Sequence, residues 1–193
     1  ETLQSIAKKY KVDIETVTSF NGLEKSAVLA VGDELIIPDA QMPNDDVPSS
    51  SGSKSSGGYF TASTPLTNVS GYFINPVPEL KRRSQNSHGP GKRGVDLAAP
   101  TGTRVLAAAE GTVLLARDGW NGGYGKFEII QHPNGTKTLY AHLSQIGVKT
   151  GAQVNQGDLI GLVGNTGKST GPHLHFEVFN AKNPGTDWSW AKK

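Results

Sequence analysis

Two of the five histidines in this chain stand two residues apart and are well suited to metal binding or acid–base chemistry. His173 and His175 lie in a run of β-branched and aromatic residues that follows a Gly-Pro turn, which predicts a strand. Side chains at positions i and i+2 of a strand point to the same face. The two imidazoles would therefore form a pair of nitrogen ligands, or one ligand beside one catalytic base. The alternative is two polar residues on the solvated face of an amphipathic strand.

Other residues supply the remaining groups that a metal site needs. The histidines are His88, His132, His142, His173 and His175, and Asp96 adds a carboxylate. A catalytic zinc holds three protein ligands and keeps one position for water, and imidazole nitrogen and carboxylate oxygen are suitable donors. Two or three of the histidines with Asp96 would provide such a site. The chain has no cysteine, which excludes disulfides, thiolate ligands and a cysteine nucleophile.

The elements that must position these groups are typical of an antiparallel, mainly β domain beginning at about residue 71. Strands are expected at residues 103–108, 111–117, 126–131, 136–142, 159–163 and 173–179. The third and fourth of these are joined by a turn containing Asn134-Gly135, which is a strong signal for a hairpin. Short strands separated by glycine-rich turns, without alternating helices, predict antiparallel pairing. His132 lies in the hairpin turn and is expected to be structural or to face solvent.

The first 38 residues have a different pattern. Apolar residues recur at helical spacing from Leu3 to Tyr10, Asp13 could cap a second short helix, and residues 31–38 predict a short strand that stops at a proline. Residues 39–70 are expected to form a flexible Ser/Gly/Pro-rich linker. We therefore expect a small module at 1–38, the linker at 39–70 and the larger domain at 71–193.

Composition narrows the choice of partners. The net charge is +2 and the sequence pI is about 8.8, and no basic stripe with interleaved aromatic residues favours nucleic-acid binding. No apolar run in the chain is long enough to span a bilayer. The chain starts at Glu1 in the middle of a motif, so a signal segment is expected to be missing through truncation. Composition leaves the oligomeric state open.

The N-terminal module carries several short motifs of one known domain. They are Thr2-Leu3-x-x-Ile6-Ala7, Tyr10-x-Val12, Asn21-Gly22-Leu23 and Val31-Gly32-Asp33-x-Leu35-x-Ile37-Pro38. Residues 1–38 thereby resemble a LysM domain, a small α+β module of the βααβ type, here without its first strand. The resemblance implies binding of N-acetylglucosamine-containing glycan through Thr2, Leu3, Asn21, Gly22 and Leu23. The alternative is a helical-hairpin spacer without a ligand.

The larger domain carries longer motifs. They are Gly94-Val95-Asp96-Leu97-Ala98-Ala99-Pro100-Thr101-Gly102-Thr103, Gly122-Gly123-Tyr124-Gly125, Tyr140-Ala141-His142-Leu143 and Gly164-Asn165-Thr166-Gly167-x-Ser169-Thr170-Gly171-Pro172-His173-Leu174-His175-Phe176-Glu177. In this order they resemble the LytM-type zinc metallopeptidases, also called the M23 peptidase family. The resemblance implies a Zn²⁺ ion held by Asp96, His175 and an upstream histidine, with His142 and His173 as catalytic residues.

The upstream ligand is where this sequence departs from the common pattern. Many family members read His-x-Gly-x-Asp, which would place the ligand at Lys92, and a lysine would have to lose its proton beside a cation. Members with a longer insert after a His-Gly pair resemble this chain better, which favours His88. The competing interpretation is an inactive zinc site, with His88 as a surface loop residue.

The resemblance implies a zinc-dependent endopeptidase that cuts stem peptides or cross-bridges of peptidoglycan, outside the cytoplasm in the bacterial cell envelope or as a secreted protein. A LysM-like module would bind the glycan of the same polymer. Two alternatives remain. One is a catalytically inactive LytM-type module that binds and activates a separate cell-wall hydrolase, and the other is a glycan-binding scaffold.

Overall fold

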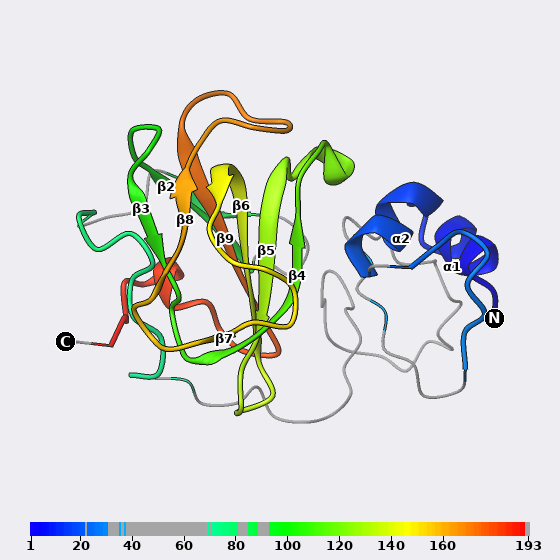
Figure 1. The fold of residues 1–193 in the computed structure, drawn as a ribbon, viewed down its shortest axis with the longest axis horizontal. Coiled ribbons are helices and arrows are strands. Elements are labelled where there is room, and N and C mark those ends of the chain that lie inside the picture. The colour runs from blue at the N-terminus through cyan, green and yellow to red at the C-terminus, as the bar shows by residue number, and fades with distance from the viewer. Residues whose placement is uncertain are drawn as a thin grey trace, which may run out of the picture. The chain divides into compact units, whose positions relative to one another are not determined.

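The computed structural model describes residues 1–21, 23–30, 35, 37, 69, 71–80, 85–88 and 93–191, with 16, 19–20 and 85–88 described by their backbone alone. The chain divides into two compact units, Glu1–Thr64 and Pro65–Lys193. Figure 1 shows a helical pair in the first unit and a twisted β-sheet in the second. The predicted linker at 39–70 lies outside the described residues apart from Val69.

The described part of the first unit contains two short helices, as the spacing of apolar residues predicts. Helix α1 (Leu3–Lys9) begins at Thr2, whose side chain accepts a hydrogen bond from the Ser5 N–H in a capping box. Helix α2 (Ile14–Asn21) packs its buried Val17 against Leu3. The strand expected at 31–38 falls mostly on residues outside the description. Within the described residues, no helix has the length and hydropathy needed to cross a bilayer.

The second unit is an antiparallel β-sheet, which confirms the predicted fold class. Its strands are β1 (Gln85–His88), β2 (Gly94–Ala98), β3 (Arg104–Leu106), β4 (Gly111–Arg117), β5 (Lys126–Gln131), β6 (Lys137–Ile146), β7 (Gln153–Val154), β8 (Leu159–Val163) and β9 (His173–Phe179). The order across the sheet is β1-β2-β9-β6-β5-β4-β7, and β8 pairs with β3 and β6. Every strand pair is antiparallel.

Strand β9 is central to this unit because it carries residues of the core and of the candidate site on opposite faces. Leu174 and Phe176 are fully buried, and Phe176 packs against Tyr140 of β6 with ring centroids 5.3 Å apart. His173 and His175 alternate with them along the strand. The alternation expected from the sequence is therefore present. Strand β9 lies between β2 and β6 and pairs with both.

The strands expected at 103–108 and 111–117 exist as β3 and β4, where β3 is shorter than expected. Strand β3 pairs with β8, and β4 pairs with β5 and β7. Strand β2 was not among the expected strands. Its Gly-Val-Asp-Leu-Ala sequence is short, and its pairing with β9 joins segments far apart in the chain, a contact that local periodicity does not report.

Candidate functional site

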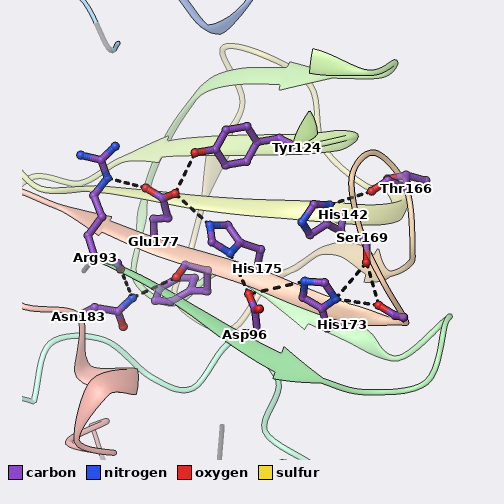
Figure 2. Close-up of polar contacts among 12 residues, drawn as sticks. Arg93, Asp96, Tyr124, His142, Thr166, Ser169, His173, His175, Glu177 and Asn183 are labelled. Atoms are coloured by element: carbon purple, nitrogen blue, oxygen red, sulfur yellow. Dashed lines mark hydrogen bonds and ion pairs between the residues drawn. The ribbon is translucent and has the colours of Figure 1, made fainter. Parts of the chain in front are cut away.

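The register between β2 and β9 brings the predicted carboxylate and histidines together. Asp96 lies directly opposite His175, and Ala98 lies opposite His173. The His175 Nδ1–H donates to Asp96 Oδ1 at 2.9 Å, and His173 Nε2 lies 3.6 Å from the same oxygen. Figure 2 shows the Asp96 carboxylate between the two imidazoles. The two histidines therefore share one face of β9 and converge on Asp96.

A backbone carbonyl and a serine hydroxyl orient the imidazole of His173. Its Nδ1 lies 2.8 Å from the carbonyl oxygen of Gly171 and 3.2 Å from Ser169 Oγ. A carbonyl can accept but not donate, so Nδ1 carries the hydrogen. The lone pair of the neutral ring is then on Nε2, the nitrogen that faces Asp96.

His142 reaches the same site through an irregularity in β6. The pairing of β6 with β5 shifts register between Tyr140 and Leu143, and His142 has a φ of 60° inside this bulge. A bulge re-aims side chains that regular alternation would place on the other face. The His142 ring lies 4.7 Å from the His173 ring and 5.9 Å from the His175 ring, measured between centroids.

The loop between β8 and β9 fixes the orientation of His142. Its Nδ1–H donates to the Thr166 carbonyl at 2.8 Å, so its Nε2 holds the lone pair. The loop is itself held close to the start of β5, because Thr166 Oγ1 accepts from the Lys126 N–H at 3.0 Å. Gly167 has a φ of 71°, and a Cβ there would meet the Gly123 carbonyl at 2.2 Å, so this close approach requires glycine.

A buried carboxylate that the sequence analysis did not assign to the site supports His175 from the other side. The His175 Nε2–H donates to Glu177 Oε1 at 2.9 Å, and the Tyr124 hydroxyl donates to the same oxygen at 3.0 Å. Arg93 Nε donates to Glu177 Oε2 at 2.6 Å. Glu177 is 1% exposed. Its position four residues after His173 on one strand is the signal that would have identified it.

Burial and the neighbouring charges separate the protonation states of the two buried histidines. Burial lowers the pKa of His142 to about 4, against the opposing effect of its hydrogen bond to Thr166. Burial also acts to lower the pKa of His175, but the Asp96 and Glu177 carboxylates outweigh it and raise the pKa to about 9. Without a metal, His142 is therefore neutral near pH 7 while His175 is an imidazolium between two carboxylates.

The donor set fits a zinc ion in its chemistry. A cation that took the place of the proton between His175 Nδ1 and Asp96 Oδ1 would meet one imidazole nitrogen and one carboxylate oxygen, which are zinc donors. Among the residues with described side chains, no three such groups form a metal-binding cluster. The backbone of the predicted third ligand, His88, pairs with Gly94 two residues before Asp96. Its predicted role as a ligand, and the position of Lys92, lie outside the described side chains.

His132 is structural and separate from this site. It is 2% exposed, its Nδ1 lies 2.7 Å from the Glu110 carbonyl oxygen and its Nε2 lies 2.8 Å from Thr138 Oγ1. Of the two interpretations of the sequence, the structural one holds and the solvent-facing one is wrong.

The residues expected to bind glycan lie at the ends of the two helices in the first unit. The Thr2 side chain caps α1, and the Leu3 side chain is 2% exposed in the small core. Asn21 Nδ2 donates to the Val17 carbonyl at 2.7 Å. Leu23 is half-buried, and Gly22 lies outside the described residues. The Leu3 side chain therefore contributes to the core and has no free surface for a sugar.

The antiparallel sheet brings three histidines and an aspartate together in one place. The sequence profile of Peptidase family M23 matches residues 90–186, and the profile of the LysM domain matches residues 1–38. This chain belongs to peptidase family M23 and carries a LysM domain at its N-terminal end.

Relatives of the chain are peptidases by name. Over 115 residues it is 43% identical to the DD-carboxypeptidase/endopeptidase Mpg of Neisseria meningitidis serogroup B, covering 60% of this chain and 24% of that protein. It is 47% identical over 92 residues to the peptidoglycan DD-endopeptidase ShyA of Vibrio cholerae, covering 47% of this chain and 21% of that protein. An uncharacterized metalloprotease of Buchnera aphidicola is 37% identical over 138 residues, 63% of this chain and 36% of that protein. The matched part thus spans between 21% and 36% of the length of these relatives.

One solved structure relates the fold to a peptidase directly. The structure of the antimicrobial peptidase lysostaphin from Staphylococcus simulans superposes with a TM-score of 0.50 and 31% sequence identity, covering 58% of this chain and 51% of that chain. This likeness agrees with the mainly β fold expected for the family.

Proposed function

We propose that this chain is a zinc-dependent endopeptidase that hydrolyses peptide bonds in the stem peptides or cross-bridges of peptidoglycan. Membership of peptidase family M23 supports hydrolysis of a peptide bond. The observation that carries the proposal is the convergence of His142, His173 and His175 around Asp96. The names of the relatives Mpg and ShyA support a cell-wall substrate.

Within this proposal, His88, Asp96 and His175 would hold the zinc ion. A bound zinc ion lowers the pKa of its water from about 15.7 to about 7 and polarises a carbonyl oxygen. Asp96 and His175 are held in place by their pairing across β2 and β9. The fixed register means that these two donors need no rearrangement of the backbone to face one cation.

His142 and His173 would move protons. Each donates its Nδ1–H to a backbone carbonyl, of Thr166 and Gly171 respectively, and so keeps Nε2 available as an acceptor. His142 is neutral near pH 7 because burial lowers its pKa to about 4. A proton taken up at Nε2 from the attacking water can later be given to the leaving amine, and the protonated ring can donate a hydrogen bond to the oxyanion.

The LysM domain would keep the enzyme on its substrate. A glycan-binding module joined to the catalytic domain through residues 39–70 would raise the effective concentration of wall peptides. The proposal includes a LysM module at 1–38, a linker at 39–70 and a peptidase domain at 71–193. It also includes secretion or a location in the cell envelope. LysM and a wall peptidase in one chain both suggest function outside the cytoplasm.

The test is metal-dependent release of peptide fragments from purified peptidoglycan. We expect EDTA to abolish release and zinc to restore it, and His175→Ala to be inactive. Asp187→Asn is the matched surface control, because Asp187 forms an exposed ion pair with Lys182, and it should retain activity. Activity of His175→Ala equal to that of the unmodified chain would overturn the proposal. Zinc binding without any fragment release would instead point to an inactive module.

A further inference from the structure

We infer that Glu177 is a positioning residue that holds His175 so that its Nδ1 faces Asp96 and is the nitrogen offered to the metal. This inference deepens the proposed function and rests on a metal at Asp96 and His175. Glu177 itself would not touch the metal or the substrate, because the ring of His175 separates it from Asp96.

The geometry of β9 places the two carboxylates on opposite ends of one imidazole. His175 and Glu177 share a face because they are two residues apart on the strand. Glu177 Oε1 lies 2.9 Å from Nε2, and Asp96 Oδ1 lies 2.9 Å from Nδ1. Figure 2 shows the ring between the two acids. Rotation of the ring about its axis would break both hydrogen bonds, so the pair of acceptors defines which nitrogen faces which acid.

The carboxylate of Glu177 is itself held by donors from two other segments. Tyr124 donates to Oε1 at 3.0 Å and Arg93 donates to Oε2 at 2.6 Å. The Arg93 guanidinium stacks over the Phe179 ring at 4.5 Å, and Asn183 Nδ2 donates to the Arg93 carbonyl at 2.6 Å. A buried carboxylate that is 1% exposed needs such partners to remain charged. These contacts make Glu177 a fixed acceptor.

A fixed acceptor determines the tautomer of His175 when a metal binds. An ionised carboxylate can only accept, so the hydrogen stays on Nε2 and the lone pair is on Nδ1. A carboxylate on the second nitrogen of a metal-bound histidine also increases the basicity of the ligand, and its loss lowers metal affinity by roughly 10–100-fold. Glu177 has the position of such a carboxylate, because its Oε1 lies 2.9 Å from Nε2 of His175 while Nδ1 faces Asp96.

The experiment measures the zinc affinity of the full chain by competition with a chelator of known affinity. We expect Glu177→Gln to weaken zinc binding by roughly 10–100-fold. Glu128→Gln is the matched control, because Glu128 is a fully buried glutamate on β5 whose Oε1 accepts from the Gly147 N–H rather than from a histidine. The control should keep the zinc affinity of the unmodified chain.

A spectroscopic measurement separates positioning from a general structural effect. In the zinc-loaded chain, ¹⁵N NMR of His175 should show the hydrogen on Nε2 and the metal on Nδ1, and Glu177→Gln should weaken or lose the Nε2–H signal. Tyr124→Phe removes one donor to Glu177 and keeps the aromatic ring, so it serves if Glu177→Gln fails to fold. We expect it to weaken zinc binding by a smaller factor.

The outcomes distinguish this inference from the proposed function. An unmodified chain that binds no zinc would overturn both. If the unmodified chain binds zinc, an unchanged affinity and an unchanged His175 signal in Glu177→Gln would overturn the positioning role alone. Should that variant not fold, unchanged zinc affinity in Tyr124→Phe would do the same.

Discussion

At the scale of single residues, the orientation of His142 depends on an unfavourable backbone conformation. A non-glycine residue with a φ of 60° has a free-energy cost of about 1–3 kcal/mol, and such residues cluster at functional sites. The bulge in β6 and the hydrogen bond from Nδ1 to Thr166 hold the residue in place. The proposed catalytic role would explain why a histidine occupies a position that glycine or asparagine would adopt more readily.

This conformation predicts that two substitutions of His142 lower activity alike but differ in their effect on stability. We expect His142→Gly and His142→Ala both to lower kcat by roughly 10²–10⁴-fold, because a proton-transfer group is lost. The glycine variant should be more stable than the alanine variant by about 1 kcal/mol, because alanine is strained at positive φ. Urea unfolding compares the two variants, and zinc content should remain that of the unmodified chain. Equal stability of the two variants would argue against the left-handed backbone at this position.

At the scale of elements, strand β5 carries a carboxyl group inside the protein away from the site. Glu128 is fully buried, and burial raises its pKa to about 8 although the Gly147 and Val148 N–H groups act in the opposite direction. Its Oε2 is buried and has no hydrogen-bond partner among the described residues. The neutral, protonated form is therefore the one that this packing favours.

The raised pKa of Glu128 makes stability depend on pH. The unfolded chain releases this proton near pH 4.5 and the folded chain near pH 8, so the contribution of Glu128 is fully present below pH 4.5 and is lost as pH rises to 8. We expect the unfolding free energy to fall by a few kcal/mol across this window, at about 1.36 kcal/mol per pKa unit. Glu128→Gln should have a flatter profile, measured by urea unfolding at pH 5 and pH 8. The difference between the two chains cancels the titration of other groups, and parallel profiles would contradict the prediction.

Local patterns predicted the elements that depend on neighbouring residues, and missed those that depend on distant ones. Strands β5, β8 and β9 match their expected ranges, because alternation and the Asn134-Gly135 turn are local signals. The same alternation indicated that His173 and His175 share a face. The pairing of β2 with β9 and of β3 with β8 joins distant segments. The positive φ of His142 depends on tertiary contacts and has no signature in the sequence.

At the scale of the whole molecule, the chain combines a LysM domain with a peptidase domain. If the two act on the same polymer, binding and hydrolysis can be separated by substitution. The proposed zinc ligand His175 lies in the second unit, and the residues expected to bind glycan lie in the first.

An inactive full-length chain should therefore still bind cell-wall material. We expect His175→Ala to sediment with insoluble peptidoglycan and to be released by soluble oligomers of N-acetylglucosamine. Glucose oligomers of the same length are the control, because they lack the acetamido group, and they should release little protein. Failure to sediment, or equal release by both oligomers, would support the interpretation of residues 1–38 as a spacer.

The alternation along β9 also limits how this protein can misfold. A slip of one residue against β2 would carry the side chains of Leu174 and Phe176 to the polar face and the imidazoles of His173 and His175 into the apolar core. Such a molecule would lose its packing and its chemistry in the same event. We therefore expect a sample of this protein to contain folded molecules with an intact site and unfolded molecules. We expect no well-packed form in which the site alone is lost.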